Sequence, residues 1–262
     1  MSFHVLAFKS GTAIAVKLIF IGKYMNNNLT EKQKYKIIRP IFSEHKEDIN
    51  EMPVIKNDFE DIDDWEQFAK DLVLRNYNNV TAKTNNANTL VIMHKKDENL
   101  ECFWNDPLKY VGLYSGCKAV STPDFSVTPK MNRNMINYNV FRNRWIGVTW
   151  QGCGLKVIPA MQWCDERTLD LCLSGVEYGT PVLISTIGVK KNIGIFLLGF
   201  NKIKTKINPP IFIVFGSFIE GMTGNFVFYK YEDAWEETKP VEQFLFEIPK
   251  IVNIPEEVQF GK

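Results

Sequence analysis

Short apolar runs separated by longer amphipathic stretches make up most of the chain after residue 88. Each run has about five to seven residues and is continuous rather than alternating, which is typical of strands covered on both faces. The stretches between the runs have the length of helices. Strands that alternate with helices indicate βα units and a mainly parallel sheet. The predicted strands are 90–93, 117–120, 155–161, 181–187 and 211–215, and the predicted helices are 107–114, 132–151, 166–174 and 192–207.

Two α/β architectures fit this pattern. Repeated βα units can curl into a TIM-like barrel, complete or partial, or spread into an open doubly wound sheet. Periodicity alone does not separate the two, so we take the TIM-like arrangement as the working prediction and the open sheet as its alternative. In both architectures ligands bind at the carboxyl ends of the strands, on the loops that lead into the helices.

The amino-terminal part of the chain has a different composition. Residues 44–71 contain eleven Asp or Glu, three Lys and no Arg, a net charge of −8. Residues 61–74 have the spacing of an amphipathic helix, and 76–88 read as a polar loop. We therefore divide the chain into an acidic amino-terminal elaboration, residues 1–88, and a basic α/β domain, residues 89–262.

No apolar stretch near the amino terminus is long enough to cross a membrane. Residues 13–22 are interrupted by Lys17 and followed by Lys23, whereas a spanning helix needs about 20 apolar residues. The five cysteines lack C-x-x-C spacing, which favours reduced thiols. We expect a cytoplasmic protein without a membrane partner, and its natural start is either Met1 or Met25.

A formal net charge of only +1 conceals a strong asymmetry. Residues 125–219 contain eleven Lys or Arg and four Asp or Glu, a net charge of +7. A basic surface attracts phosphate-bearing ligands such as nucleotides or nucleic acids. The alternative explanation is that the acidic segment packs against the basic half. Arg142 and Arg144, beside Trp145, combine forked donors with an aromatic ring, which suits phosphate and base binding.

Polar residues follow the predicted strands at their carboxyl ends. Asp124 is the best candidate for a catalytic carboxylate, as a general base, a hydrogen-bond anchor or a ligand of Mg²⁺, the one cofactor we consider. Its alternative role is to cap a turn. Trp163 follows another strand, and Ser185 and Gly188 lie in the loop after the next one.

Several common chemistries lack a motif. The three histidines are His4, His45 and His94, and none falls in the basic rim of predicted loops, which argues against a Ser-His-Asp triad or a multi-histidine metal site. No Walker A or G-x-G-x-x-G sequence is present. Cys153 is flanked by glycines, and a helix-ending turn explains it better than a nucleophile loop. Asp165 fits a helix cap. Whether the chain is an enzyme stays open.

An ordered set of short motifs resembles a known family. The set includes Pro123-Asp124-Phe125-Ser126, then Arg142-Asn143-Arg144-Trp145, and then Ser185-Thr186-Ile187-Gly188. Together they resemble a bacterial and phage family described as domain of unknown function 4417, over about residues 89–230. The resemblance implies a phage or mobile-element setting and no particular activity. Its recurrent polar positions correspond to Asp124, Ser126, Arg142, Asn143, Arg144, Gln151, Trp163, Ser185 and Gly188.

These observations lead to one hypothesis and one alternative. We expect a phage or mobile-element protein that binds a nucleotide or nucleic acid at its strand ends, with hydrolysis or phosphoryl transfer as an extension. Arg142 and Arg144 would hold phosphate, and Trp145 or Trp163 would stack on a base. Asp124 would transfer protons or bind Mg²⁺. The alternative is a non-catalytic protein that inhibits or activates a host or defence factor.

Overall fold

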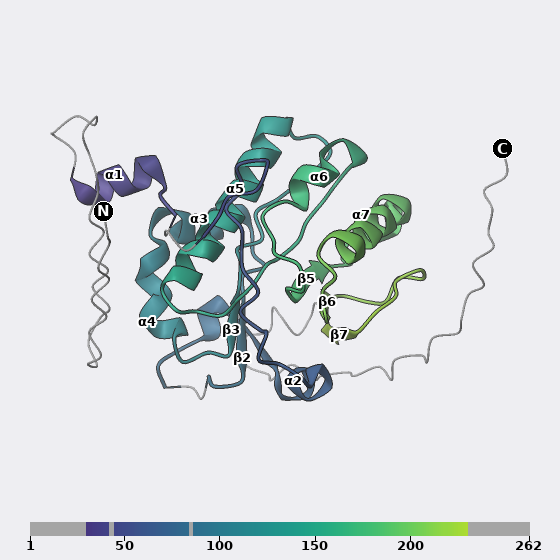
Figure 1. The fold of residues 1–262 in the computed structure, drawn as a ribbon, viewed down its shortest axis with the longest axis horizontal. Coiled ribbons are helices and arrows are strands. Elements are labelled where there is room, and N and C mark those ends of the chain that lie inside the picture. Colours follow the sequence, from purple (N-terminus) through teal and green to yellow (C-terminus); the bar gives the residue numbers. More distant parts are fainter. Residues whose placement is uncertain (1–29, 42–44, 84–85, 230–262) are drawn as a thin grey trace.

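The strands at the centre of the structure are all parallel (Figure 1). The computed structural model describes residues 30–41, 45–83 and 86–229, so the two candidate starts, Met1 and Met25, lie outside the described residues. Within this part, the strands form a four-stranded and a three-stranded sheet, each in chain order. The first sheet contains β1 (Val73–Asn76), β2 (Thr89–Ile92), β3 (Ala119–Ser121) and β4 (Val157–Ile158), and the second contains β5 (Val182–Ser185), β6 (Phe212–Phe215) and β7 (Phe226–Tyr229).

The two sheets are linked at their facing edges. Just beyond β4, Ala160 forms a parallel bridge with Leu183 of β5. The Met161 amide donates to the Leu183 carbonyl at 2.8 Å, and the Leu183 amide donates to the Pro159 carbonyl at 3.0 Å. The strands therefore continue from one sheet into the other in the order of the chain.

Helices lie on the outer face of this layer. Figure 1 places α3, α4 and α5 beside the first sheet, and α6 and α7 beside the second. The α-helices are α1 (Glu31–Ile38), α2 (Trp65–Asp71), α3 (Asp97–Asn105), α4 (Val111–Tyr114), α5 (Arg133–Gly152), α6 (Leu169–Cys172) and α7 (Ile193–Lys206). The short 3₁₀ helices are η1 (Tyr77–Asn79), η2 (Pro107–Tyr110), η3 (Glu166–Thr168) and η4 (Val189–Lys191).

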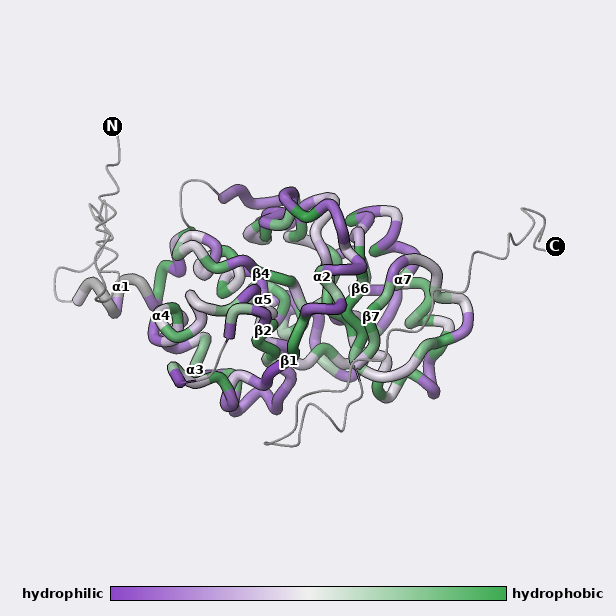
Figure 2. The backbone as a smooth tube through the Cα atoms, turned by 90° about the horizontal axis from the view of Figure 1, so that it is seen from below, coloured by the Kyte–Doolittle hydropathy of each residue, from purple (hydrophilic) through white to green (hydrophobic). Residues whose placement is uncertain are grey.

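Alternate strand residues face two different cores, as the period of a β-strand requires. In β2, Val91 faces the outer core, whereas Leu90 and Ile92 face the inner one. The inner core contains side chains from all seven strands, and Phe68 of α2 packs against it. Figure 2 shows the same arrangement, with hydrophobic strands at the centre and hydrophilic segments outside. The strands therefore curve around one shared interior.

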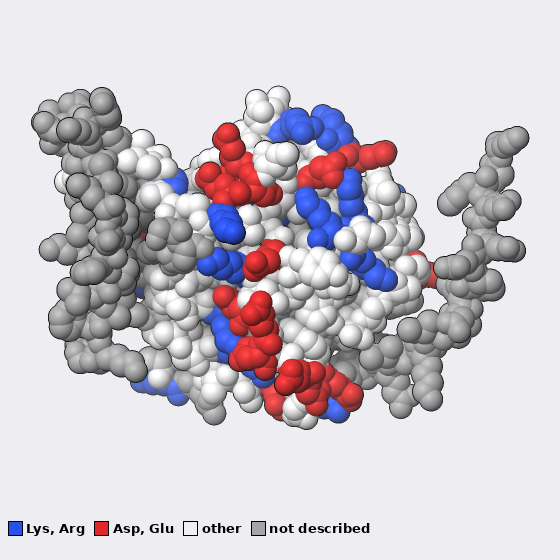
Figure 3. All heavy atoms as spheres, viewed as in Figure 1, with Lys and Arg blue, Asp and Glu red and all other residues white. Residues whose placement is uncertain are grey.

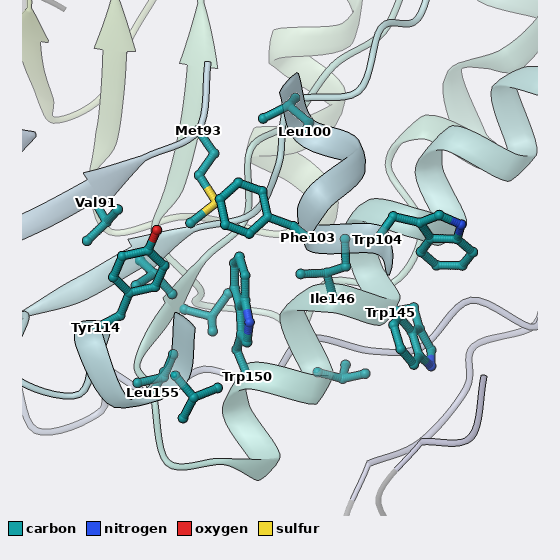
Figure 4. Close-up of a cluster of buried hydrophobic side chains, with 14 of the residues drawn as sticks. Val91, Met93, Leu100, Phe103, Trp104, Tyr114, Trp145, Ile146, Trp150 and Leu155 are labelled. Carbon is teal, nitrogen blue, oxygen red and sulfur yellow. The ribbon is translucent and has the colours of Figure 1, made fainter. Parts of the chain in front are cut away.

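Helix α5 fills the outer core of the first sheet. Figure 4 shows Trp150 lying between Tyr114 and Phe103, and its ring meets the Phe103 ring edge-on at a centroid distance of 5.8 Å. The helix begins after Asn132, whose side chain accepts from the Asn134 amide at 2.9 Å. The buried aromatic packing of this single helix anchors the strand layer from outside.

The sequence predicted most of these elements correctly. All five predicted strands are present, and so are helices or helical turns in the four predicted helical segments. The structure adds β1, β7, α1 and α3, and the helix predicted at 61–74 is confined to α2. The mainly parallel α/β class is thus confirmed. Between β7 and β1 no ladder closes the layer among the described residues.

Two further predictions concern the chain as a whole. We keep the division at residue 88 as a proposal, although β1, which precedes it, pairs with β2. In the part of the chain that the structure covers, no helix has both the length and the apolarity to cross a membrane.

Asp165 caps η3 as predicted, since its Oδ1 accepts from the Thr168 amide at 2.9 Å.

Candidate functional site

The inner face of the strand layer becomes polar at its carboxyl end. Inner-facing residues in the middle of the strands are apolar, as Leu74, Leu183 and Val227 illustrate. Two residues further along a strand, the side chain points to the same face again. Those next positions are Asn76 in β1, His94 beyond β2, Ser121 in β3, Ser185 in β5 and Tyr229 in β7.

The most distinctive feature of this end is a pair formed by His94 and Asp124. The imidazole Nε2 lies 3.1 Å from Asp124 Oδ2, and the two side chains are 13% and 18% exposed. The loops that carry them are tied together, because the Asp124 amide donates to the Met93 carbonyl at 3.2 Å. The Met93 amide in turn donates to Ser121 Oγ at 3.1 Å.

The histidine also reaches the second sheet. Its ring stacks on Phe215, the last residue of β6, with a centroid distance of 4.8 Å and an interplanar angle of 19°. In the parallel ladders Phe215 is in register with Ser185 on one side and Tyr229 on the other. The pair therefore joins the ends of β2 and β3 to β6.

Four buried polar atoms at this end have no hydrogen-bond partner among the described residues. They are Asn76 Nδ2, His94 Nδ1, Asp124 Oδ1 and Tyr229 Oη. A buried polar atom without a partner costs about 1–3 kcal/mol, so native structures normally satisfy it with protein, water or ligand. Because these four atoms come from strand ends on one side of the layer, we take this end as the candidate binding site. We call Asn76, His94, Asp124 and Tyr229 the strand-end cluster.

Burial governs the ionisation of this cluster. Burial raises the pKa of Asp124, the His94 ring opposes that rise, and the Asp97 carboxylate adds to it. Burial also raises the pKa of Tyr229, so its hydroxyl stays protonated and can donate. Asp97 itself accepts from the Ser126 amide at 3.0 Å and from Ser126 Oγ at 2.8 Å. Ser126, a predicted site residue, thus lies in the same loop as Asp124 and anchors it to α3.

Asn143 positions the loop that carries Asp124. Its Nδ2 donates to the Pro123 carbonyl at 2.8 Å and to the Ala160 carbonyl at 3.2 Å. These carbonyls belong to the loops after β3 and β4, and Asn143 is only 6% exposed. Asn143 therefore lies on α5 and holds the loop that carries Asp124 in place.

Arg144, which the sequence predicts to hold phosphate, is buried on α5. Its side chain is 2% exposed. Its Nε donates to the Ser174 carbonyl at 2.8 Å, and Nη2 donates to the Cys172 carbonyl at 2.9 Å. Arg144 lies on the side of α5 that packs against α6, so its guanidinium reaches the Cys172 and Ser174 carbonyls and not the surface.

Arg142 and Trp145, two further predicted site residues, are buried as well. Arg142 is 6% exposed and pairs with Glu101, and its guanidinium lies 3.8 Å from the Phe125 ring centroid. Trp145 is fully buried, and its indole N–H donates to the Arg39 carbonyl at 2.8 Å. The combination of arginine and tryptophan that suggests a phosphate and base site is here the packing of α5.

Trp163 packs between two helices. Its indole N–H donates to the Ile195 carbonyl at 3.0 Å, and its ring stacks on Phe196 at 5.5 Å. A Cβ at Gly199 would lie 2.2 Å from Trp163 Nε1, so α7 can approach this ring only because it has glycine there. The structure thus gives Trp163 a packing role, and we leave it out of the proposed ligand site.

Gln151 holds an amino-terminal segment against α5. Its Oε1 accepts from the Lys56 amide at 3.0 Å, and its Nε2 donates to the Lys56 carbonyl at 2.8 Å and to Asp58 Oδ2 at 2.5 Å. The Val157 amide, at the start of β4, also donates to Asp58. This position lies at the amino end of the sheet, far along the strands from the strand-end cluster, so Gln151 is not brought into the site.

Asp58 gives a testable pH dependence. Burial raises its pKa above the ordinary value of 3.8, against the lowering effect of the Gln151 hydrogen bond. The folded protein then binds this proton more tightly than the unfolded chain does. The contribution of Asp58 to the free energy of unfolding therefore falls as pH rises from the pKa of the unfolded chain to that of the folded protein, and it is constant at higher pH. We subtract the free energy of unfolding of Asp58→Asn from that of wild type, both measured with urea. We expect this difference to be more positive at about pH 3.5 than at about pH 7, because only wild type gains stability from the extra bound proton. A difference that does not change with pH would contradict the assignment.

Ser185 and Gly188 lie where the sequence predicted, in the loop after β5. Ser185 Oγ accepts from the Ile187 amide at 3.2 Å. Gly188 has φ 77°, in the left-handed region, and begins η4 with its two exposed lysines, Lys190 and Lys191. This loop therefore places positive charge on the same end of the sheet as the strand-end cluster.

His94 was not among the predicted site residues. It lies outside the basic segment 125–219, yet it contacts Asp124 at the strand ends. The signal was available, because His94 stands two residues after the inner-facing Ile92 and so points to the same face. The view of Cys153 as structural fits its surroundings, since burial raises the pKa of its thiol to about 11.

Metal binding by Asp124 stays a prediction. Within the described ranges, no three His, Cys, Asp or Glu side chains are grouped closely enough to hold a metal ion. Any Mg²⁺ at Asp124 would therefore need oxygen ligands of another kind, such as amides, hydroxyls or a bound phosphate.

The fold and the strand-end cluster define a parallel α/β protein with a polar site at the carboxyl ends of its strands. The chain belongs to the family described as Domain of unknown function (DUF4417), whose model matches residues 56–232. The predicted resemblance is confirmed, and the match begins earlier than residue 89, so it includes β1.

The curated relatives come from bacteriophages. The chain is 31% identical over 123 residues to the "Gene 1 protein" of Mycobacterium phage D29, which is 46% of this chain and 46% of that protein. It is also 31% identical over 123 residues to the "Gene 1 protein" of Mycobacterium phage L5, where the match covers 54% of the relative. The chain thus spans about half the length of the curated relatives it matches. No solved structure matches it.

Proposed function

We propose that this chain is a partial TIM-like barrel that binds a phosphate-bearing ligand, a nucleotide or nucleic acid, at the carboxyl ends of its strands. The observation that carries the proposal is the strand-end cluster, with its four buried polar atoms that lack a partner among the described residues. A partial barrel is supported by the inner core, to which all seven strands contribute. In barrels of parallel strands, this end is the one that holds ligands.

Lysines around the cluster supply the positive charge that a phosphate needs. Lys95 and Lys96 directly follow His94, and Lys190 and Lys191 lie in η4 after β5. Figure 3 shows blue side chains gathered over α6 and α7, whereas red ones lie over α2. The buried carboxylate of Asp124 repels phosphate. We therefore place the phosphate on the lysine loops and the hydroxyl or amino groups of the ligand on the cluster.

A matched pair of lysine variants tests this placement. Lys190→Gln with Lys191→Gln removes two charges at the carboxyl end of the sheet, and Lys204→Gln with Lys206→Gln removes two charges from the last turn of α7, at the opposite end. We expect the first double variant to weaken binding of labelled nucleotides or oligonucleotides at least about tenfold and to flatten its salt dependence. The second should change affinity by less than about twofold.

Two results would contradict the proposal. Equal losses in both double variants would assign binding to the overall basic surface and not to the strand ends. Absence of binding to single- and double-stranded DNA, RNA and nucleotides at low salt would remove the phosphate-bearing ligand altogether.

A second candidate function rests on a separate observation. Several large apolar side chains are exposed on the basic half, and four of them lie in the loops after β5 and β6 and on α7: Ile187, Ile193, Leu198 and Phe218. Exposed apolar residues near charged ones are typical of protein-binding surfaces. A host or defence protein recovered with the chain, and lost on Phe218→Ser, would favour the non-catalytic interaction protein.

A further inference from the structure

The two nitrogens of His94 have different surroundings. Nε2 faces Asp124 Oδ2 at 3.1 Å, whereas Nδ1 is buried and has no partner within the described part of the chain. A carboxylate that accepts from one ring nitrogen keeps the proton there, which leaves the lone pair on the other nitrogen. Nδ1 is therefore the atom through which this ring can accept a proton.

We propose that His94 is a general acid–base catalyst in the strand-end site, with Asp124 as its positioning residue. The inference rests on the proposed function, since the proton must come from a hydroxyl group in a bound phosphate-bearing ligand or from water beside it. It names a phosphoester as the substrate class and His94 Nδ1 as the atom that exchanges the proton.

The surroundings of His94 hold the ring in one orientation. Phe215 stacks on one face of the imidazole at 4.8 Å, and Asp124 fixes its edge. Asp124 is in turn fixed through its own amide, and Asn143 holds the carbonyl of the preceding Pro123. A catalytic ring needs this kind of support, because small misplacements of a proton acceptor cost a large part of the rate.

A purely structural role explains the pair less well. A histidine that only stabilises the fold normally has both ring nitrogens hydrogen-bonded, and its carboxylate partner is normally saturated as well. Here one nitrogen of His94 and one oxygen of Asp124 have no partner in the described structure. Both atoms lie in the strand-end cluster with the Asn76 amide and the Tyr229 hydroxyl, which can donate to ligand oxygens.

The reaction step balances without a further reagent. The attacking oxygen, from water or from a ligand hydroxyl, forms a bond to phosphorus while its proton moves to His94 Nδ1. The bond between phosphorus and the leaving oxygen breaks, and the leaving oxygen takes the proton back from the imidazolium. Asp124 stabilises the positive ring between the two transfers.

The first test measures turnover and binding in the same full-length chain. Nucleotides and oligonucleotides are supplied as substrates, with and without Mg²⁺, and the variants are His94→Gln, Asp124→Asn and, as the matched control, His45→Gln. His45 is also buried, but it contacts Gln151 at the other end of the sheet. We expect His94→Gln to lower kcat about 10²–10⁴-fold with binding retained, and His45→Gln to stay within about threefold of wild type.

Two further measurements separate the roles. Imidazole ¹⁵N chemical shifts should show His94 protonated at Nε2 in wild type and a mixture of tautomers in Asp124→Asn, whose kcat should also fall. With ¹⁸O-labelled water, label in the released phosphate identifies water as the attacking group. A cyclic or transferred product without label identifies a ligand hydroxyl, and either result supports the inference.

The outcomes distinguish this inference from the proposed function. If ligand binds but no phosphoester is consumed, or if His94→Gln keeps the wild-type kcat, the acid–base role is overturned while ligand binding stands. If no phosphate-bearing ligand binds at all, the proposed function fails and the inference fails with it. Thermal unfolding of each variant shows whether a lost rate reflects a lost fold.

Discussion

Replacing Arg144 with alanine is expected to lower the free energy of unfolding by about 3–5 kcal/mol. The guanidinium is almost completely buried and donates to three oxygen acceptors, the Ser174 carbonyl, the Cys172 carbonyl and Asn143 Oδ1, and to the sulfur of Met161. Truncation leaves these acceptors without a donor and opens a cavity between α5 and α6. Urea unfolding followed by circular dichroism measures the loss.

The charge of Arg144 makes the expected loss large. Burial lowers its pKa to about 10, so the side chain is still cationic at neutral pH and must be compensated by the acceptors around it. Carbonyl and amide oxygens provide that compensation here. Hydrogen bonds to a charged group contribute about 1.5–3 kcal/mol each. The alanine variant no longer has to bury a charge, but this gain is smaller than the loss of all these hydrogen bonds together.

The control for this prediction is an arginine on the surface. Arg133, in the first turn of α5, is exposed and donates to the Arg167 carbonyl at 2.9 Å. Arg133→Ala should change stability by less than about 0.5 kcal/mol. If Arg144→Ala were as stable as Arg133→Ala but bound ligand more weakly, Arg144 would be a ligand residue, as its sequence position predicts.

The periodicity of the chain predicted the sheet because its strands carry a simple signal. The runs at 90–93 and 211–215 are continuous and apolar, since each strand packs against two cores at once. β1 was missed because its sequence, Val73 to Asn76, contains an arginine and ends in an asparagine. Its membership in the sheet depends on pairing with β2, a tertiary contact that no local pattern records.

The candidate site was predicted in part. Five predicted residues do lie at or behind the strand ends, because the carboxyl ends of parallel strands always meet at one edge of the sheet. They are Asp124, Ser126, Asn143, Ser185 and Gly188. Arg142, Arg144 and Trp145, also predicted for the site, are instead buried where α5 packs. Arginine next to tryptophan serves equally well to bind a ligand and to pack a helix, and composition alone does not tell which side of a helix faces solvent.

The same ambiguity explains why His94 was overlooked. Site residues were predicted from the basic segment, and His94 lies outside residues 125–219. Its partner Asp124 precedes that segment by one residue and is close only because β2 and β3 are adjacent. A site built from neighbouring strands is better predicted from strand order than from charge along the chain.

Replacing Trp145 with alanine is expected to have a comparably large effect, again about 3–5 kcal/mol of unfolding free energy. The ring is fully buried, and it meets the Trp104 ring edge-on at a centroid distance of 5.3 Å. The Arg39 guanidinium lies 3.7 Å from the Trp104 ring centroid and 4.8 Å from that of Trp145. Truncation thus removes core volume and one wall of the site that holds Arg39.

A phenylalanine at this position separates the two contributions. Trp145→Phe keeps most of the ring packing but loses the indole N–H, which donates to the Arg39 and Pro40 carbonyls at 2.8 and 3.1 Å. We expect it to cost about 1–2 kcal/mol and to speed amide exchange at Arg39 and Ile41 more than in the strands. Global unfolding measures the first effect, and hydrogen exchange measured residue by residue gives the second. If both variants kept wild-type stability and exchange, Trp145 would not be the residue that fastens the segment after α1 to α5.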